Sequence, residues 1–375
     1  MRIALFTECY RPIQNGIVAA VEALSSSLRA RGHEVLCVTP AMPGYDGDDE
    51  SVIRIPSLPL PTPTAYRLTL PFLPAALEGT PRRLSIVHAH SAFVTGWMAI
   101  RAARRFGVPL VYTYHTRLED YVHYVPFEER TTRGAALRLT KNYANAADAV
   151  IVPTEAMERH LRELGVASRI EVVPSGIDLA AFSAGARRDG VRARLGAGPG
   201  EPLVLSVGRL AKEKNLDLAL AAFAALDLPQ ARLAVVGDGP EREHLEALAA
   251  RLGIAGRTRF AGALARTELP DAYASADAFV FPSASETQGL VLVEALAAGL
   301  PVVAVDTPET RDVLGGAGSL VPADPRAMAL ALAGALADGD RRAARVAAER
   351  YDQDRIVDRV LGIYRSLQGP ASKAG

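Results

Sequence analysis

The sequence predicts an α/β protein made of two domains, each built on a doubly wound parallel sheet. Short apolar runs alternate with helical patterns along almost all of the 375 residues, which is typical of consecutive βαβ units. A chain of this length corresponds to two or three domains with separate cores. Apolar periodicity fades in the Gly- and Arg-rich stretch after Pro174, so we expect one domain over residues 1–174 and a second over 175–353.

The first domain is expected to alternate strands with helices from its first residues. The apolar runs that predict its strands lie at residues 3–6, 34–39, 86–89, 110–114, 149–153 and 170–173. Apolar residues at helical spacing predict a long helix over residues 17–31.

The second domain repeats this alternation. Its predicted strands lie at residues 203–207, 232–236, 258–260, 278–281 and 302–305. A helical pattern follows the first of them, over residues 216–226. The tail over residues 354–368 has apolar residues at helical spacing, at Ile356, Val360, Ile363 and Leu367, which predicts a last helix.

Charge and cysteine content exclude several classes of protein. Lysine plus arginine number 42, and so do aspartate plus glutamate. The chain therefore lacks the excess of positive charge that would indicate a nucleic-acid partner. Cys9 and Cys37 fit a reducing compartment, as small buried side chains, better than a disulfide framework. Because the first residues read as a strand, we expect no signal peptide, and no stretch approaches the ~18 apolar residues of a membrane span. We therefore expect a cytoplasmic protein.

Two glutamates, Glu286 and Glu294, lie in the βαβ unit of residues 278–305. They are a little over two helical turns apart, so one carboxylate in the loop and one in the helix can face a single elongated ligand. The amides near Gly289 and Leu290 form an anion site at the helix start. Paired glutamates also occur by chance on solvated helices. The loop position at the carboxyl end of a strand favours a ligand site, and carboxylates with helix amides suit a sugar nucleotide.

A second loop of the same kind follows the strand at residues 203–207. Gly208 and Arg209 come directly after this strand, and Lys214 precedes the next helix. Arginine offers a planar fork of donors and lysine a mobile point charge, and both suit a diphosphate. A basic cluster by itself is usually a solvated turn, but the adjacent glycine indicates close approach of a ligand to the backbone.

Nicotinamide-dependent dehydrogenases show the same alternation of strands and helices. Their first strand leads into GxGxxG, and a carboxylate ends the second strand. Here residues 9–16 read CYRPIQNG, and the second strand ends in VTP at residues 38–40. Gly237 and Gly239 lack a third glycine at the required spacing. The sequence therefore argues against nicotinamide chemistry.

These motifs together resemble the retaining glycosyltransferases of family 4, which have the GT-B fold. The motifs are GR at 208–209 with Lys214, VGDGP at 236–240, FAG at 260–262, and the segment from Glu286 through Glu294. The resemblance covers nearly the whole chain. It implies two Rossmann-like domains facing a cleft, with the acceptor bound by the first and the nucleotide sugar by the second. It also implies that the last helix packs on the first domain.

The resemblance assigns roles in donor binding. Arg209 and Lys214 would bind the donor diphosphate and stabilise the departing nucleoside diphosphate. Glu286 would hold hydroxyls of the transferred sugar, and Glu294 those of the ribose. The other expected donor-binding positions are glycines and backbone groups: Gly16, Gly208, Gly262 near the nucleobase, and Gly289 with Leu290 at the distal phosphate.

Two residues of the first domain are expected near the reaction centre. Gly16 begins the first helix, where the family has a double glycine and this chain has Asn15 before Gly16. His115 comes just after the strand at residues 110–114. The resemblance implies that His115 contacts the transferred sugar or the reacting groups, although a histidine in this position is as often structural.

The run at residues 115–126 indicates a class of acceptor. It resembles the corresponding stretch of bacterial enzymes that glucosylate diacylglycerol. Four polar and aromatic residues of this run are expected to line the acceptor side: Glu119, Asp120, Tyr121 and Tyr124. The alternative is that they belong to an ordinary loop and helix start. Two features favour a membrane surface as a partner. One is the Pro- and Leu-rich stretch at residues 58–77, and the other is the basic series Arg130, Arg133, Arg138 and Lys141. Either feature can also be a packed loop or a solvated face.

The leading interpretation is a retaining transfer of glucose from UDP-glucose to a lipid such as 1,2-diacylglycerol. The expected catalytic residues are His115, Arg209, Lys214 and Glu286. No carboxylate is placed as a covalent nucleophile, so we expect front-face displacement without a cofactor or metal. The acidic run at residues 46–50 is interpreted as a solvated turn. One alternative is a GDP-mannose-dependent mannosyltransferase acting on phosphatidylinositol or another glycan acceptor. The other is a catalytically silent sugar-nucleotide binder, which the presence of Arg209, Lys214, Glu286 and Glu294 together disfavours.

Overall fold

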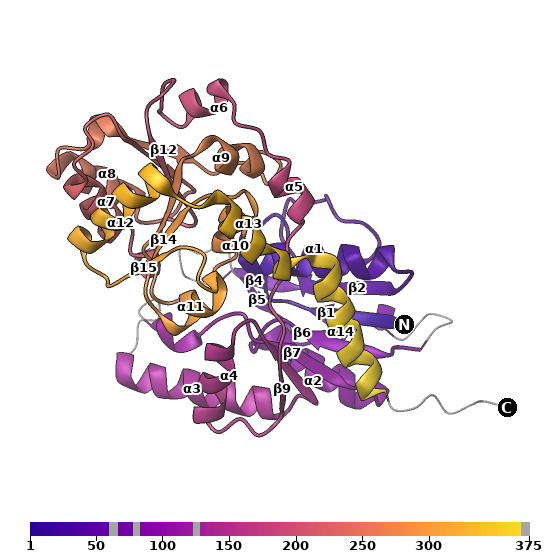
Figure 1. The fold of residues 1–375 in the computed structure, drawn as a ribbon. Helices are drawn as coiled ribbons and strands as arrows, with labels where there is room; N and C mark the ends of the chain where they lie inside the picture. Colours follow the sequence, from indigo (N-terminus) through magenta and orange to yellow (C-terminus); the bar gives the residue numbers. More distant parts are fainter. Residues whose placement is uncertain (60–66, 78–82, 123–127, 369–375) are drawn as a thin grey trace. The chain divides into compact units, whose positions relative to one another are not determined.

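The computed structural model describes residues 1–59, 67–77, 83–122 and 128–368 (Figure 1). The chain forms two compact units. Unit 1 comprises Met1–Gly176 together with Gln353–Gly375, and unit 2 comprises Ile177–Asp352. Where the chain passes between them, the amide of Ile177 donates to the carbonyl of Tyr351 at 3.0 Å, so the two ends of unit 2 are joined.

Unit 1 contains a seven-stranded parallel sheet in the order β3-β2-β1-β6-β7-β8-β9. The strands are β1 (Arg2–Phe6), β2 (Glu34–Pro40), β3 (Val52–Ile55), β6 (Ile86–Ala89), β7 (Leu110–Thr113), β8 (Ala149–Val152) and β9 (Arg169–Val172). Most are short apolar runs because both faces of the sheet are covered by helices. The strand order reverses between β1 and β6, which is where open α/β sheets bind ligands.

Helices cover both faces of this sheet (Figure 1). They are α1 (Gly16–Ala30), α2 (Val94–Phe106), α3 (Glu129–Asn145), α4 (Glu155–Glu163) and α14 (Gln353–Leu367). One core joins α1 and α14 to the sheet through Leu28, Val357 and Leu361, and a second core includes Met98 of α2. The tail of the chain therefore completes the fold of unit 1.

The sequence did not predict some short strands of unit 1. β3 pairs with β2 at the edge of the sheet, and its four residues are mostly half-buried. The stretch at residues 58–77 contributes to an antiparallel pair, β4 (Ser57–Pro59) and β5 (Arg67–Thr69). Strands of three or four residues next to prolines carry too short a pattern to be recognised.

Unit 2 contains a six-stranded parallel sheet in the order β12-β11-β10-β13-β14-β15. The strands are β10 (Leu203–Val207), β11 (Arg232–Val236), β12 (Thr258–Gly262), β13 (Ala278–Phe281), β14 (Val302–Val305) and β15 (Ser319–Val321). Only β15, a three-residue edge strand, was absent from the predicted strands of this half. The order reverses between β10 and β13, as in a dinucleotide-binding sheet.

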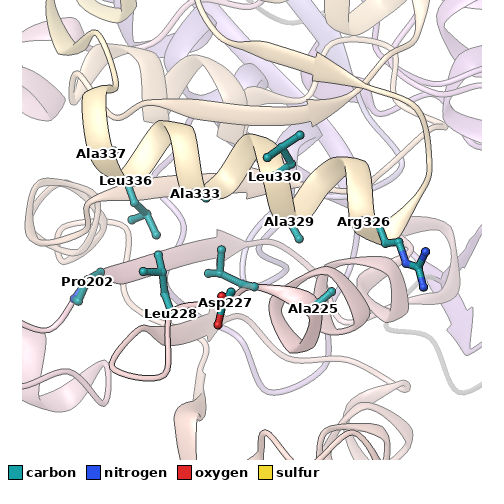
Figure 2. A pocket seen from close by; sticks show the side chains of 11 residues that line it. Pro202, Ala225, Asp227, Leu228, Arg326, Ala329, Leu330, Ala333, Leu336 and Ala337 are labelled. Atoms are coloured by element: carbon teal, nitrogen blue, oxygen red, sulfur yellow. The ribbon is translucent and has the colours of Figure 1, made fainter.

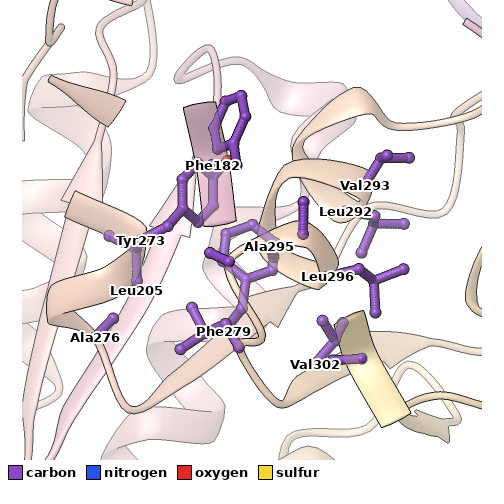
Figure 3. Close-up of a cluster of buried hydrophobic side chains, with 14 of the residues drawn as sticks. Phe182, Leu205, Tyr273, Ala276, Phe279, Leu292, Val293, Ala295, Leu296 and Val302 are labelled. Atoms are coloured by element: carbon purple, nitrogen blue, oxygen red, sulfur yellow. The ribbon is translucent and has the colours of Figure 1, made fainter. Parts of the chain in front are cut away.

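Unit 2 is also covered on both faces. Its helices are α5 (Leu179–Ser183), α6 (Asp189–Arg194), α7 (Leu216–Ala225), α8 (Arg242–Arg251), α9 (Leu269–Ser275), α10 (Leu290–Ala297), α11 (Pro308–Leu314), α12 (Pro325–Asp338) and α13 (Arg341–Ala348). Figure 3 shows the core under α10, where Phe182, Tyr273 and Phe279 pack near Leu296. A second core joins α7 and α12 to the other face. The predicted class, two doubly wound parallel-sheet halves, is confirmed.

Candidate active site

The predicted donor residues of unit 2 lie in loops at the carboxyl ends of its strands. Gly208, Arg209 and Lys214 follow β10, and Glu286 follows β13. β10 and β13 are hydrogen-bonded neighbours at the point where the strand order reverses. The side chains that the sequence separates by more than 70 positions therefore leave the sheet side by side.

Glycine lets the loops after β10 and β11 approach each other closely. The amide of Gly208 donates to the carbonyl of Val236, and the amide of Gly237 donates to the carbonyl of Gly262 at 2.9 Å. Gly237 has a φ of 137°, and a Cβ at this position would lie 1.8 Å from the carbonyl oxygen of Gly208. No side chain fits there, so glycine is needed at residue 237 for the backbones to approach.

Three side chains join the β10 loop to the β13 loop. Asn215 Nδ2 donates to the carbonyl of Pro282 at 3.2 Å. The hydroxyls of Ser283 and Ser285 both donate to the carbonyl of Glu213, at 3.1 and 3.2 Å. These three were not recognised from the sequence, where each is an ordinary polar loop residue. They fix the position of both loops that carry the predicted donor residues.

The predicted phosphate-binding lysine contacts the predicted sugar-binding glutamate. Lys214 Nζ donates to Glu286 Oε1 in an ion pair, with 24% of the lysine side chain and 16% of the glutamate side chain exposed. Arg209 is more exposed, five residues before Lys214. The structure thus brings Lys214 and Glu286 together and leaves part of each side chain accessible.

Helix α10 begins at the same loop. Gly289 has a φ of 74°, and the first hydrogen bond of the helix runs from the amide of Leu292 to the carbonyl of Gly289. The amides of Gly289 and Leu290 precede that bond. Amides at a helix start carry partial positive charge, so this position can bind an anion such as phosphate.

Glu294 is held inside unit 2 in the second turn of α10. Its side chain is 3% exposed and accepts a hydrogen bond from the Tyr273 hydroxyl at 2.9 Å, while Arg266 Nη1 lies 3.6 Å from the other oxygen. Burial raises the pKa of the Glu294 carboxyl, and Arg266 opposes this effect. Tyr273 was not recognised from the sequence, because it reads there as one more apolar residue of a helix.

The end of β12 supplies the last predicted donor position. Gly262 has a φ of 76°, and its carbonyl accepts the Gly237 amide. A Cβ at residue 262 would lie 3.9 Å from Arg242 Nη1, and Arg242 Nη2 donates to the carbonyl of Phe260. The missing side chain at Gly262 leaves its backbone accessible next to this arginine.

In unit 1, the loop after β1 ends in a capped helix. Asn15 Oδ1 accepts a hydrogen bond from the amide of Val18 at 2.9 Å, and Asn15 Nδ2 donates to Cys9 Sγ at 3.5 Å. Gly16 is the first residue of α1. Asparagine is a favoured N-cap, which explains why it precedes Gly16 in place of a second glycine.

His115 belongs to a row of three histidines at the carboxyl ends of β6 and β7, in which His88 and His90 are buried and His115 is half-buried. His90 Nδ1 and His115 Nε2 are 2.9 Å apart, and the rings are stacked with centroids 5.2 Å apart. The ring of His88 lies 4.2 Å from that of His90. His88 Nδ1 contacts the hydroxyl of Tyr364 in α14 at 2.6 Å, and His88 Nε2 contacts that of Thr113 at 2.7 Å.

Burial keeps these imidazoles neutral. It lowers the pKa of His115 to about 4 and that of His88 to about 3, and it lowers the pKa of His90 as well. His88 and His90 were not recognised from the sequence. Their signal was their alternation at the end of a buried strand, which places both side chains on one face.

The predicted acceptor-side residues lie in and around a single turn, Leu118–Asp120. Glu119 is 1% exposed, and its Oε1 lies 2.8 Å from His160 Nε2 of α4. Arg117 Nε lies 3.1 Å from Asp120 Oδ2. Asp120 and Tyr121 are partly exposed, whereas Glu119 faces inward and lines no open surface. Tyr124 lies outside the described residues.

Two domain families match the sequence. Residues 14–181 match Glycosyltransferase Family 4, and residues 188–351 match Glycosyl transferases group 1. Over 322 residues the chain is 34% identical to an alpha-monoglucosyldiacylglycerol synthase of Streptococcus pneumoniae, with 84% of this chain and 73% of the relative covered. The chain belongs to glycosyltransferase family 4.

This family 4 glycosyltransferase is also similar to a protein whose name states its donor. It is 34% identical to a GDP-mannose-dependent alpha-mannosyltransferase of Mycobacterium tuberculosis over 388 residues, covering 98% of this chain and 97% of the relative. The predicted family and the predicted class of enzyme are thus confirmed.

Solved structures share the fold of this family 4 glycosyltransferase. The sucrose-phosphate synthase of Thermosynechococcus elongatus has a TM-score of 0.79 at 25% identity, with 98% of both chains covered. Anabaena HepE in complex with UDP-glucose has a TM-score of 0.77 at 21% identity, covering 98% of this chain and all of that one. The GT-B fold is confirmed.

The glycosyltransferase also has a hollow away from the predicted donor residues. It measures about 460 Å³ and lies between α12 and the segment after α7, where Leu336 faces Leu228 (Figure 2). Its lining is mostly apolar and includes none of the predicted donor residues. We therefore do not assign the donor to it.

Within the described ranges, no three His, Cys, Asp or Glu side chains are grouped so that they could hold a metal ion. The acidic run at residues 46–50 is partly paired: Asp48 Oδ2 lies 2.6 Å from Arg54 Nε, and Asp49 accepts from the amide of Ser51. Among the helices described, none has the length and apolar character needed to span a bilayer.

Proposed function

We propose that this glycosyltransferase transfers glucose from UDP-glucose to a membrane lipid such as 1,2-diacylglycerol, with retention, giving an α-glucoside. The observation that carries the proposal is the contact of Lys214 with Glu286 at the ends of neighbouring strands, beside the start of α10. A cation, a carboxylate and helix amides in one place match the phosphates and hydroxyls of a sugar nucleotide.

On the donor side, Lys214 and Arg209 bind the diphosphate. The amides of Gly289 and Leu290 bind its distal phosphate, because they lie at the positive end of α10. When the diphosphate takes over the Lys214 ammonium, Glu286 is released to accept hydrogen bonds from the transferred sugar.

The nucleoside is held by the inner part of the same unit. Glu294 accepts hydrogen bonds from the ribose hydroxyls, and the Tyr273 hydroxyl keeps its carboxylate in place. Backbone groups near Gly262 contact the nucleobase. In unit 1, Gly16 lies by the reaction centre and His115 contacts the transferred sugar.

The acceptor assignment rests on the Streptococcus relative and on the surface of unit 1. Several large apolar side chains are exposed there, including Phe72 at 65%, Phe93 at 48% and Trp97 at 46%. Arg101 Nη1 donates to the carbonyl of Pro71, which joins the segment of Phe72 to α2. Exposed aromatic and basic side chains together favour a membrane surface. The basic series on α3, Arg130, Arg133, Arg138 and Lys141, is exposed as well.

The reaction we propose is a front-face displacement without a metal ion. The acceptor hydroxyl oxygen bonds to the anomeric carbon on the face from which the diphosphate leaves, and the bond from that carbon to the phosphate oxygen breaks. The hydroxyl proton passes to the departing diphosphate. Arg209, Lys214 and the α10 amides stabilise the charge that develops there.

The test is to incubate the purified protein with UDP-glucose, UDP-galactose or GDP-mannose and to measure nucleoside diphosphate release. Each donor is supplied with diacylglycerol vesicles, with vesicles lacking diacylglycerol, and without lipid. We expect release from UDP-glucose that depends on diacylglycerol, and an α-linked product by NMR. Release that is indifferent to lipid, or a β-linked product, contradicts the proposal.

A GDP-mannose-dependent mannosyltransferase is the second candidate. The observation that favours it is the Mycobacterium relative, which matches this chain over nearly the full length of both proteins. GDP release from GDP-mannose, with phosphatidylinositol or a soluble glycan as acceptor, would establish this candidate in place of the first.

A further inference from the structure

In the hydrogen bond between His90 Nδ1 and His115 Nε2, one of the two nitrogens carries the proton and the other accepts it. A neutral imidazole carries one N–H and one acceptor nitrogen. Either His90 Nδ1 donates to His115 Nε2, or the direction is reversed. The choice decides which nitrogen of His115 carries its own proton, and therefore how His115 can meet a ligand.

The other nitrogen of His90 decides between the two arrangements. His90 is 4% exposed, and its Nε2 has no hydrogen-bond partner among the described residues. If His90 Nδ1 were the acceptor, the proton would sit on Nε2 as a buried donor without an acceptor. Orphaned buried N–H groups are rarer than orphaned acceptors. The proton therefore belongs on His90 Nδ1, which donates to His115 Nε2.

His88 cannot serve as the hydrogen-bond partner of His90 Nε2. Both nitrogens of His88 are already engaged, one with Tyr364 and one with Thr113. The same contacts hold the His88 ring against His90, so the row has little freedom to rotate. Burial keeps all three rings neutral near pH 7, as the lowered pKa values of His88 and His115 indicate.

We propose that His90 is a positioning residue that holds His115 as the Nδ1-protonated imidazole, so that His115 meets an oxygen of the transferred sugar as a hydrogen-bond donor and not as a base. The encounter with sugar rests on the proposed function, whereas the proton arrangement rests only on unit 1. The inference therefore excludes His115 as the group that removes the acceptor proton, in agreement with transfer of that proton to the departing diphosphate.

The proton arrangement can be read directly by NMR on protein with ¹⁵N-labelled histidines. Two-bond proton–nitrogen correlations distinguish Nδ1- from Nε2-protonated rings, and the seven histidines can be assigned by single replacements such as His115→Gln. We expect His115 to be protonated on Nδ1 at pH 7. A wild-type His115 protonated on Nε2 overturns the proposal, whatever the enzyme transfers.

Variants then test whether His90 is the cause. His90→Leu removes the N–H group that donates to His115 Nε2. The imidazole of His115 should then exist as a mixture of both tautomers. His90→Asn keeps an amide donor near the Nδ1 position and should retain it. Tyr364→Phe is the matched control, because it removes a buried hydrogen bond from the same row without touching His115. An unchanged His115 tautomer in His90→Leu overturns the role of His90.

Kinetics give the second readout. With the nucleotide sugar that the wild type uses, His90→Leu should lower kcat/KM by about tenfold, which corresponds to the free energy of one hydrogen bond. His90→Asn and Tyr364→Phe should lower it much less. An equal loss in Tyr364→Phe and His90→Leu would make His90 merely structural and overturn the proposal. Failure of the wild type to use any sugar nucleotide would remove the proposed function, while the NMR result would still decide the proton arrangement.

Discussion

The Lys214 ammonium and the Glu286 carboxylate neutralise one another only in part, since water reaches both side chains. A partly exposed ion pair contributes about 1 kcal/mol or less to stability. A charge aimed at a departing phosphate contributes far more to a reaction. The pair should therefore matter to transfer much more than to folding.

Lys214→Ala tests this difference. We expect kcat to fall by about 10²–10³-fold, because one group that stabilises the developing charge is lost. The thermal midpoint should change little. Lys212→Ala is the matched control, since Lys212 is an exposed lysine in the same turn. Activity retained by Lys214→Ala would place the phosphate elsewhere.

Tyr273→Phe tests the support of Glu294. Without the hydroxyl, the buried carboxylate loses a hydrogen-bond donor and its fixed orientation. We expect KM for the donor to rise about three- to tenfold with little change in kcat, as for a lost ground-state contact. Tyr351→Phe is the control, because that hydroxyl is equally buried but donates to the carbonyl of Val313. Equal kinetics in the two variants would mean that Glu294 does not touch the donor.

The row of histidines should make unit 1 sensitive to acid. Unfolded histidines bind protons below about pH 6.5, whereas His115 and His88 in the folded protein bind them only near pH 4 and 3. The unfolded state thus binds more protons in this window, so stability is full above pH 6.5 and falls as pH drops towards 4. The loss should be on the order of 3 kcal/mol for His115 alone.

The single tryptophan, Trp97, lies in α2 and reports on unit 1. Urea unfolding followed by its fluorescence at several pH values measures this loss. His88→Gln should flatten the dependence on pH, because one suppressed titration is removed. His244→Gln should not, because His244 is an exposed residue of unit 2. Equal slopes in all three proteins would contradict the explanation.

The start of α10 depends on a backbone conformation that suits glycine. Gly289 has a φ of 74°, and a Cβ there would lie 3.0 Å from Phe281 Cζ. Gly289→Ala should lower the stability of unit 2 by about 1–2 kcal/mol and raise KM for the donor, since the anion site shifts. Calorimetry measures the first effect and steady-state kinetics the second.

Gly334→Ala is the control for this change. Gly334 lies exposed inside α12 with open space where its Cβ would be, so the same replacement should stabilise the protein by up to about 1 kcal/mol. A destabilisation of similar size in both variants would show that the conformation of Gly289 is not the cause.

Sequence patterns located the elements whose chemistry is local. Most of the longer strands contain an apolar run that the sequence shows directly, and the loops after β10 and β13 carry charged residues next to those runs. The edge strands β3 and β15 were missed because three or four residues contain too little pattern. Tyr273, His88 and His90 were missed because their importance lies in contacts with residues far away in the sequence. The burial of Glu119 depends on His160 from another helix, which no spacing reveals.

The last helix belongs to the first unit, and unit 1 should not fold without it. α14 buries Ile356, Val357, Val360, Leu361, Ile363 and Tyr364 against the sheet. At about 1.5–3 kcal/mol for each large apolar side chain, this burial rivals the ~5–15 kcal/mol of an entire domain. A chain ending at Asp352 should therefore show the Trp97 fluorescence of an unfolded protein.

Unit 2 should be unaffected by this truncation and retain its own calorimetric transition. A chain ending at Gln368 is the control, because it keeps all of α14. A folded unit 1 in the shorter chain would mean that α14 is only an addition to a complete core.

The hydrogen bond from Ile177 to Tyr351 joins the two ends of unit 2. Unit 2 is thus a closed insert within unit 1, attached at two adjacent covalent joins. Everything proposed here for donor recognition in unit 2 lies between those joins, and the proposed acceptor surface lies outside them. A single exchange of residues 177–352 with the matching part of a relative would move the proposed nucleotide- and phosphate-binding residues together, while Gly16 and His115 would stay with unit 1.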